Sequence, residues 1–372
     1  MWDKHLHIVS LNVPLPANYG GIIDIWYKIK ALAQCGVKVH LHCFTYGRQP
    51  AKELEDVCYS VNYYNRHIGI NNWFSTEPYI VKSRDNAELL QNLIDFDAPI
   101  LFEGLHTSHF LNASQLRSRL KIVRTHNIEH QYYNYLKKQE CNPMRKFYFA
   151  TESAKLQRYE DNLAFADIIL AISPSDTQYF SEKYGKTFLI HPFHPNNDVS
   201  CPTGLGKHIL YHADLSVPEN IKAALFLTEA LKGIDFQVIF AGRNPSKTII
   251  KHTKDTNIQV IGNPSQTEMD NLVRAAQIIA LPTFQPTGIK LKLIESLYKG
   301  RHCVATPAMV ENTGLEPLCH IAPNTKDFND ICRNLIKTPM TASDIEKRKS
   351  ALKNYDTKSN AEKIIWLITS NL

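Results

Sequence analysis

The sequence predicts an α/β protein of two doubly wound domains, and three observations support this prediction. Its 372 residues are too many for one small core and suit two domains of roughly 100–200 residues each. Strand-like and helix-like segments alternate from one end to the other, as in parallel sheets covered by helices. Residues 191–207 hold three Pro, two Gly and consecutive Asn without periodicity, which is typical of an interdomain linker.

The first half begins with a β-loop-α-β unit. Residues 5–13 are rich in β-formers, and Gly20 and Gly21 end the loop that follows. Apolar residues then recur at helical spacing over 22–33, and residues 37–43 alternate as a second strand. Such a unit predicts a right-handed crossover and parallel strands. Further predictions for this half are strands at 100–103, 121–125 and 167–172, a helical region that includes 154–165, and a helix start at Ser173–Asp176.

The second half repeats the same alternation. The predicted strands are 208–213, 235–241, 257–261, 277–282 and 302–305, and the predicted helices are 219–231, 246–253, 267–275, 289–299 and 361–368. In open α/β sheets, ligands bind beyond the carboxyl ends of the strands, so a cleft between two such domains is the expected site. Solute-binding proteins share this organisation, and the fold alone therefore leaves the function open.

Composition and charge exclude several classes of protein. Apolar residues make up 44% and charged residues 21%, which excludes a disordered or collagen-like chain. The 42 Lys and Arg exceed the 36 Asp and Glu by a net charge of only +6. Because the basic clusters are short, solvated helix faces are favoured over a nucleic-acid site. The same mild charge leaves peripheral attraction to an anionic membrane surface open.

No segment of the sequence has the pattern of an export signal or a membrane span. The N-terminus lacks the apolar region of a signal peptide, and no stretch approaches the roughly 20 apolar residues that cross a bilayer. The eight Cys are scattered without a C-x-x-C pair, which fits small buried apolar side chains better than zinc or redox chemistry. We therefore predict a reduced, cytoplasmic protein, with the inner membrane surface as the alternative location.

The segment 282–300 carries the most informative chemical pattern. A predicted strand ends, Thr287-Gly288 forms a turn, and a helix begins whose free backbone N–H groups suit a phosphate. Lys290 adds a cation where the helix dipole alone would disfavour one, and Glu295 is placed to accept hydrogen bonds from a ribose. In the alternative interpretation, Lys292 pairs with Glu295 on the surface and Lys290 is merely solvated.

Loops of the first half hold further candidates. Gly20-Gly21 lets a backbone approach a ligand or simply starts a helix, and a full G-x-G-x-x-G fingerprint is absent. His126 follows the strand 121–125 and is placed to donate to a sugar hydroxyl or leaving group, with Glu129 as a cap of the next helix. Glu103 and His106 end the preceding strand and allow the same interpretation. A structural histidine bonded to the backbone is the alternative.

Taken together, these segments resemble a known family. The chain is similar to GT-B glycosyltransferases of the family 4 kind, in particular the bacterial branch with a Thr-Gly-Ile-Lys-x-Lys helix start that makes surface polysaccharides and glycans. The segments that carry the resemblance follow one another in order over most of the chain: Asn18–Gly21, Arg124–Glu129, Leu156–Glu160, Asp167–Asp176 and Thr287–Gly300.

The resemblance implies a GT-B architecture, in which two Rossmann-like domains face each other across a cleft. The expected divisions are an acceptor-side domain at 1–190, a linker at 191–207, a nucleotide-sugar domain at 208–355, and a helix at 356–372 that returns to the first domain. It also implies a retaining hexosyltransferase (EC 2.4 class) that needs neither metal nor cofactor. Such an enzyme moves a sugar from a UDP- or GDP-linked donor to a glycan, lipid-linked or protein-linked acceptor.

By the same resemblance, individual residues acquire roles. His126 contacts the transferred sugar near the reaction centre, and Lys290 belongs to the phosphate-binding helix start, which makes these two the expected catalytic residues. Glu295 matches the acid that binds the ribose. The expected donor-binding residues are Gly20, Gly21, Arg243, Thr287, Gly288, Ile289, Lys290 and Glu295.

Two departures from the family pattern bear on these roles. The usual E-x7-E pair keeps its second member as Glu295, but Thr287 stands at the first position. The family's Gly-Arg at the first strand of the nucleotide domain is replaced by Tyr211–Asp214. Lys290, helped by Arg243, is expected to supply the compensating charge. The missing carboxylate favours front-face substitution over a covalent double displacement.

Two other functions remain open at this point. A nucleotide-sugar epimerase on the same fold would need acid/base residues and no acceptor. A non-catalytic or degenerate nucleotide-sugar-binding protein is the alternative that the missing glutamate favours most.

Overall fold

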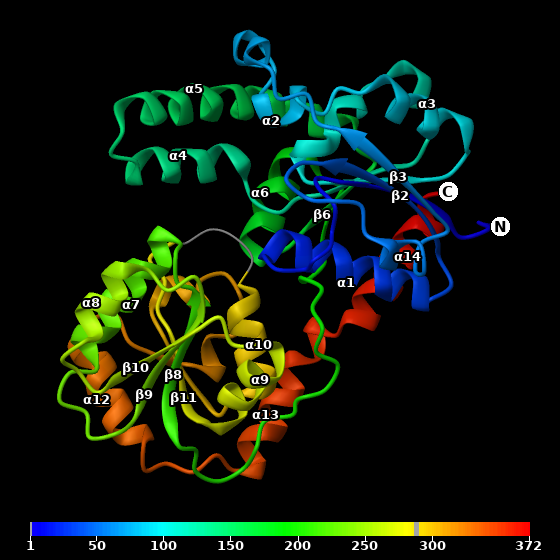
Figure 1. Ribbon diagram of the computed structural model, residues 1–372. Coiled ribbons are helices and arrows are strands. Elements are labelled where there is room, and N and C mark those ends of the chain that lie inside the picture. The colour runs from blue at the N-terminus through cyan, green and yellow to red at the C-terminus, as the bar shows by residue number, and fades with distance from the viewer. Residues whose placement is uncertain (1, 286–289) are drawn as a thin grey trace. The chain divides into compact units, whose positions relative to one another are not determined.

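The computed structural model describes residues 2–285 and 290–372, and the chain forms two compact units (Figure 1). Unit 1 comprises the chain up to Pro195 together with Asn354–Leu372, and unit 2 comprises Asn196–Lys353. Each unit contains one parallel sheet with helices, which confirms the predicted α/β fold class. Unit 1 extends past residue 190 because Phe193 is fully buried in its core.

Unit 1 contains a seven-stranded sheet in the order β3-β2-β1-β4-β5-β6-β7. All strand pairs are parallel, so every strand ends at the same edge of the sheet. The structure adds β3 and β7 to the strands that the sequence predicts. The strands are β1 (His5–Ser10), β2 (Lys38–Thr45), β3 (Ser60–Asn65), β4 (Ile100–Glu103), β5 (Lys121–Arg124), β6 (Ile168–Ala171) and β7 (Thr187–Leu189).

Helices cover both faces of this sheet. The helices are α1 (Gly20–Gln34), α2 (Tyr79–Lys82), α3 (Ala87–Asp95), α4 (Glu129–Gln139), α5 (Pro143–Tyr159), α6 (Pro174–Tyr184) and α14 (Thr357–Asn371). Short 3₁₀ turns are η1 (Lys52–Leu54), η2 (Ile70–Phe74), η3 (Leu105–Phe110), η4 (Ser114–Leu116) and η5 (Glu160–Phe165). The helices α4 and α5 lie side by side as a hairpin (Figure 1).

The C-terminal helix α14 packs on α1 and completes unit 1, as predicted. Ile364 and Ile368 of α14 share one apolar cluster with Ile22, Ile25 and Ile29 of α1. These side chains are at most 1% exposed. Since burial of such a side chain contributes about 1.5–3 kcal/mol, the last helix is an integral part of unit 1.

Unit 2 contains a six-stranded parallel sheet in the order β10-β9-β8-β11-β12-β13. The strands are β8 (His208–Asp214), β9 (Val238–Arg243), β10 (Ile258–Gly262), β11 (Ala276–Leu281), β12 (His302–Ala305) and β13 (His320–Ile321). The helices are α7 (Pro218–Ala230), α8 (Lys247–Thr253), α9 (Gln266–Ala275), α10 (Leu291–Lys299), α11 (Pro307–Val310), α12 (Thr325–Leu335) and α13 (Ala342–Leu352), with 3₁₀ turns η6 (Glu316–Leu318) and η7 (Lys353–Tyr355).

Two further features of the described residues bear on the sequence predictions. All eight cysteines are free thiols, and five of them are buried. Over residues 2–285 and 290–372, the helices are too short or too polar to cross a bilayer.

Four histidines form a buried array on one face of β1 and β2. His5 Nδ1 lies 2.8 Å from His40 Nε2, and His7 Nδ1 lies 2.9 Å from His42 Nε2. The array continues through His42 Nδ1, which is 2.8 Å from the Tyr64 hydroxyl. Burial lowers the pKa of His7 and His42 and lowers that of His40 to about 4, with neighbouring imidazoles adding to the effect. These three rings are therefore neutral at pH 7.

We predict that mild acid destabilises the fold through this array. Because the folded-state pKa values lie below the ordinary value, the unfolded chain binds more protons between about pH 6.5 and pH 4. The stabilisation is therefore present above that window and is lost as the pH falls through it. Thermal unfolding followed from about pH 7.5 to about pH 5 should show a smaller drop in melting temperature for His40→Gln than for the wild type. Exposed His252 gives the matched control His252→Gln. Equal slopes for all three proteins would contradict the prediction.

Candidate functional site

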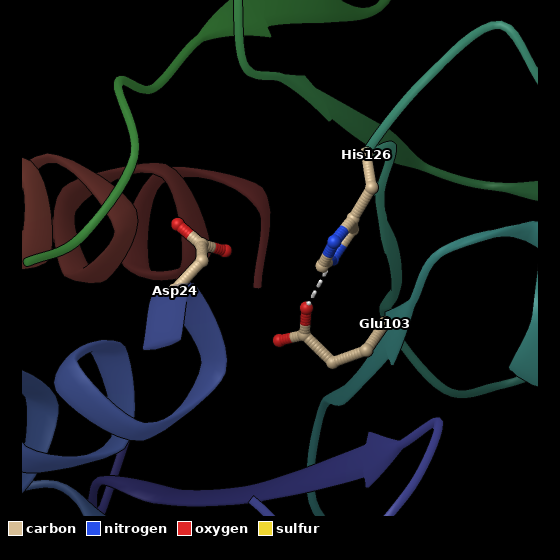
Figure 2. A group of neighbouring side chains, drawn as sticks. All are labelled: Asp24, Glu103 and His126. Atoms are coloured by element: carbon tan, nitrogen blue, oxygen red, sulfur yellow. Dashed lines mark hydrogen bonds and ion pairs between the residues drawn. The ribbon is translucent and has the colours of Figure 1, made fainter. Parts of the chain in front are cut away.

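A buried ionic cluster lies at the carboxyl ends of β4 and β5 in unit 1, and Figure 2 shows three of its members. Asp24 and Lys28 come from α1, Glu103 and Arg124 are the last residues of β4 and β5, and His126 follows β5. The first four are 0% exposed and His126 is 5% exposed. The fold thus brings charged side chains from distant parts of unit 1 into one apolar environment.

Each buried charge in this cluster has an opposite partner. Lys28 Nζ lies 3.1 Å from Asp24 Oδ2 and 2.7 Å from Glu103 Oε1. Arg124 Nη2 donates to Asp24 Oδ1 at 3.1 Å, and the Phe193 N–H donates to the same oxygen at 2.8 Å. The pairing is needed because an unpaired buried charge costs several kcal/mol.

These partners keep both carboxyl groups ionised. Burial would raise the pKa of Asp24, but the charges of Arg124 and Lys28 hold it well below its usual range. Burial would also raise the pKa of Glu103, but the charge of Lys28 and the hydrogen bond from His126 lower it below its usual value. Both acids are therefore carboxylates at neutral pH and act only as hydrogen-bond acceptors.

The cluster fixes the ring of His126 next to the start of α1. His126 Nε2 lies 3.0 Å from Glu103 Oε2 and points toward it, as Figure 2 shows. Because an ionised carboxylate only accepts, Nε2 donates, and Nδ1 is left for another partner. A Cβ built on Gly21 would lie 3.4 Å from His126 Nδ1. Gly20 and Gly21 are the first two residues of α1. The structure therefore places Gly21 and His126 side by side.

Three side chains of this cluster lie close enough together to be considered as metal ligands. Asp24, Glu103 and His126 each offer a ligand atom within 4.8 Å of the others. However, the ammonium group of Lys28 already contacts both carboxylates, and Arg124 contacts Asp24 as well. With two side-chain cations bound, this donor set does not fit a metal ion.

Glu129 and His106 form a second polar group at this edge of the sheet. The N-cap residue of α4 is Ile128, and Glu129 is the first residue of the helix, so Glu129 does not occupy the cap position. Burial raises the pKa of Glu129 to about 8, which leaves its carboxyl group largely protonated at neutral pH. His106 Nδ1 lies 3.8 Å from Glu129 Oε1, and burial holds the pKa of His106 well below its usual range.

In unit 2, two lysines lie at the start of α10. Lys290 is the N-cap residue, and its Nζ donates to the Gln285 carbonyl at 2.8 Å. Lys292 Nζ lies 5.2 Å from the centre of the Tyr211 ring. Burial lowers the pKa of each lysine to about 8. The interpretation in which Lys290 is merely solvated is therefore wrong, and two partly desolvated cations face the carboxyl edge of the sheet.

Two acids of unit 2, Glu295 and Asp214, are already paired. Glu295 Oε1 bonds to Lys299 Nζ at 3.1 Å rather than to Lys292. Arg243 ends β9 and pairs with Asp214 at the end of β8, with Nη2 3.3 Å from Oδ2. The charges of Glu311 and Glu219 oppose the effect of burial on the pKa of Lys290, whereas at Lys292 burial is the cause of the shift.

The position of Arg243 depends on the close approach of β8 and β9 at Gly242. A Cβ on the preceding Gly242 would lie 1.7 Å from the Ala213 carbonyl oxygen, so only glycine allows β8 and β9 to approach this closely. Because β8 and β9 end together, Arg243 lies at the carboxyl edge that α10 also adjoins.

Three predicted donor-binding residues, Thr287, Gly288 and Ile289, lie outside the described residues. Within the described residues, helix α10 begins at Leu291, two residues after the predicted start at residue 289.

Known proteins resemble this chain both in sequence and in fold. Residues 206–338 match the family model of glycosyl transferases group 1. This part of the chain is therefore similar to glycosyl transferases group 1, and the chain as a whole has the GT-B fold. It is 26% identical over 336 residues to an uncharacterized 44.6 kDa protein in the cps region of Klebsiella pneumoniae, a match that covers 82% of this chain and 84% of the relative.

Solved glycosyltransferases share the fold of this chain along almost its whole length. A glycosyltransferase from Rickettsia africae superposes with a TM-score of 0.63 at 15% identity, covering 100% of this chain and 99% of that one. Anabaena HepE, solved in complex with UDP and glucose, superposes with a TM-score of 0.66 at 13% identity, covering 99% and 100%. At such identities the likeness concerns the fold.

The ionic cluster predicts a specific stability effect. Replacing Lys28 with Met removes one partner and leaves Asp24 and Glu103 facing each other in an apolar environment, so the free energy of unfolding should fall by about 3–5 kcal/mol. Lys30→Met on the same helix is the matched control, because Lys30 is only half-buried and makes ring contacts instead of an ion pair. Chemical denaturation checks both. Equal stability of the two variants would contradict the account of the cluster.

Proposed function

We propose that this glycosyltransferase moves a hexose from a UDP- or GDP-linked donor to an acceptor hydroxyl in the synthesis of a surface polysaccharide. The observation that carries the proposal is the pair of desolvated cations, Lys290 and Lys292, at the start of α10 within the matched family region. A nucleoside diphosphate has the charge and geometry that such a helix start accommodates.

The comparisons support a nucleotide-sugar donor. HepE, which shares the fold, was solved with UDP and glucose, and the Klebsiella relative belongs to a cps region. In our proposal, Lys290 and Lys292 contact the diphosphate, Arg243 adds charge, and Glu295 accepts hydrogen bonds from the ribose. Thr287, Gly288 and Ile289 are further proposed donor-binding residues, and so are Gly20 and Gly21.

The proposed chemistry is electrostatic. The bond between the anomeric carbon and the diphosphate oxygen breaks, and the lysines stabilise the negative charge that develops on the departing nucleoside diphosphate. The acceptor oxygen attacks the anomeric carbon, and its proton passes to the departing phosphate oxygen. His126, oriented by Glu103, contributes through Nδ1 a hydrogen bond to a hydroxyl of the transferred sugar.

The acids of unit 1 support retention through a front-face substitution. A covalent double displacement needs a free carboxylate as nucleophile. Asp24 and Glu103 are held by Lys28 and Arg124, and burial keeps Glu129 largely protonated. Attack on the same face as the leaving group needs no such nucleophile. With two lysines on the diphosphate, we also propose that transfer requires no metal.

Two other candidates differ in what they predict. An epimerase would change the donor sugar without an acceptor and would need a free acid/base pair, whereas the acids described above are paired or neutral. A purely binding protein would bind nucleotide yet release no sugar. The missing first glutamate of the family pair, Thr287, favours this second candidate more than any other observation does.

The test is the affinity of purified protein for UDP, GDP and their hexose conjugates, measured by calorimetry for the wild type and Lys290→Ala. We expect the wild type to prefer one nucleotide, and Lys290→Ala to weaken that affinity about tenfold or more, since hydrogen bonds to charged groups contribute about 1.5–3 kcal/mol. Lys247→Ala, an exposed lysine at the start of α8, is the matched control. An unchanged affinity in Lys290→Ala, with folding intact, would refute the assignment.

A further inference from the structure

His212 is a buried histidine near the carboxyl end of β8 in unit 2. It belongs to the segment Tyr211–Asp214, which departs from the family pattern at this strand. The residue is 9% exposed, and its Nε2 has no hydrogen-bond partner within residues 2–285 and 290–372. Native structures seldom leave a buried nitrogen in this state, because the loss of its water is then not compensated.

A second histidine on the same strand provides a direct comparison. His208 and His212 are four residues apart on β8, so both side chains project from the same face of the sheet. His208 is 4% exposed, and its Nε2 donates to the Leu272 carbonyl of α9 at 3.0 Å. Both rings are buried, and the partner at Nε2 is what distinguishes them.

The charges that act on His212 come from α10. They belong to Glu295, Lys292 and Lys299. Glu295 Oε1 lies 3.1 Å from Lys299 Nζ, so these two charges largely offset each other. Lys292 Nζ lies 5.2 Å from the centre of the Tyr211 ring, and among the described residues no ion pair holds its ammonium group. The group at this end of β8 therefore has one unbalanced positive charge beside a nitrogen without a partner.

Charged groups on other elements that contact β8 are engaged with partners of their own. The strand β11 (Ala276–Leu281) has no titratable side chain. The engaged groups are Arg243 of β9 with Asp214, Asp270 of α9 with Lys299, and Glu219 of α7 with the Phe284 N–H.

His212 is uncharged in the absence of a ligand. Burial lowers its pKa to about 4, and the charges of Lys292 and Lys299 add to this effect while Glu295 opposes it. The ring is therefore neutral at pH 7. An anion bound at Lys292 would act in the opposite direction, because a nearby negative charge favours the protonated ring.

We propose that His212 takes up a proton when the nucleoside diphosphate binds, and that its Nε2 then donates a hydrogen bond to the ligand beside Lys292. The proposal rests on the proposed function and adds a property of the same donor site, the coupling of binding to protonation. One proton passes from solvent to the ring nitrogen, and no covalent bond of the ligand changes. The anion supplies both a partner for Nε2 and a negative charge for Lys292.

Proton uptake by His212 occurs in a different pH range from uptake by the lysines. A bound ring whose pKa returns to about 6.5 is largely charged at about pH 6, where the free ring is neutral. Lys290 and Lys292 are charged at that pH even without ligand, because burial lowers the pKa of each only to about 8. Since the bound form holds the extra proton, the affinity for the donor rises as the pH falls through the range of His212.

The test measures binding of UDP-glucose to the full chain by calorimetry in buffers of different ionisation enthalpy, which gives the number of protons taken up. GDP-mannose replaces UDP-glucose if the wild type prefers GDP. A sugar conjugate is used because a terminal phosphate would itself titrate at about pH 6. At about pH 6 we expect the wild type to take up about half a proton or more, and His212→Asn almost none. His208→Asn is the matched control, because His208 is similarly buried on β8 and already has its partner.

The pH dependence of the affinity is a second measurement, which needs no variant. The wild type should bind UDP-glucose about tenfold more tightly at about pH 5.5 than at about pH 7.5. Binding without proton uptake would overturn the proposal and leave the donor site of the proposed function standing. Uptake that His212→Asn retains would assign the proton to another group and would overturn the proposal as well. If the wild type bound neither conjugate, the proposed function would fail and this inference with it.

Discussion

The pairing of Asp24 with Arg124 and of Glu103 with Lys28 is the constraint on which the site in unit 1 depends. Four charges that are 0% exposed are stable only if all four are present and in contact. This requirement ties α1 to the ends of β4 and β5. It fixes the start of α1, and therefore Gly21, beside the ring of His126. The contact between Gly21 and His126 thus depends on charged side chains buried behind it.

The start of α10 in unit 2 holds a second group of charged side chains. In unit 2 Lys290 and Lys292 are positive at a helix start, where burial lowers the pKa of each to about 8. Burial of two cations costs free energy, and in the proposed function a bound nucleoside diphosphate offsets this cost.

Much of the fold was predictable from the sequence, because apolar periodicity is local. The strand 302–305 and the helix ends of unit 2 agree with the structure within a few residues. The strands β3 and β7 escaped prediction because β3 (SVNYYN) is a mostly half-buried polar edge strand and β7 has only three residues. Their partners come from distant segments, which a local pattern does not contain.

Individual residues of the site could be predicted from the sequence, but the contacts between them could not. His126, Glu103 and Gly21 stand out as residues that end strands or begin helices, but their contact depends on strand order. Asp24 and Lys28 look like an ordinary i, i+4 surface pair on an amphipathic helix, and only the structure shows that both are fully buried.

The central claim is that ionised Glu103 fixes the tautomer and orientation of His126. Nitrogen-15 NMR of histidine-labelled protein measures this directly, with the signals of His126 assigned by their loss in His126→Gln. The account predicts that Nε2 of His126 carries a proton near neutral pH, because it donates to the Glu103 carboxylate. A neutral ring that carries its proton on Nδ1, with Nε2 unprotonated, would contradict the account.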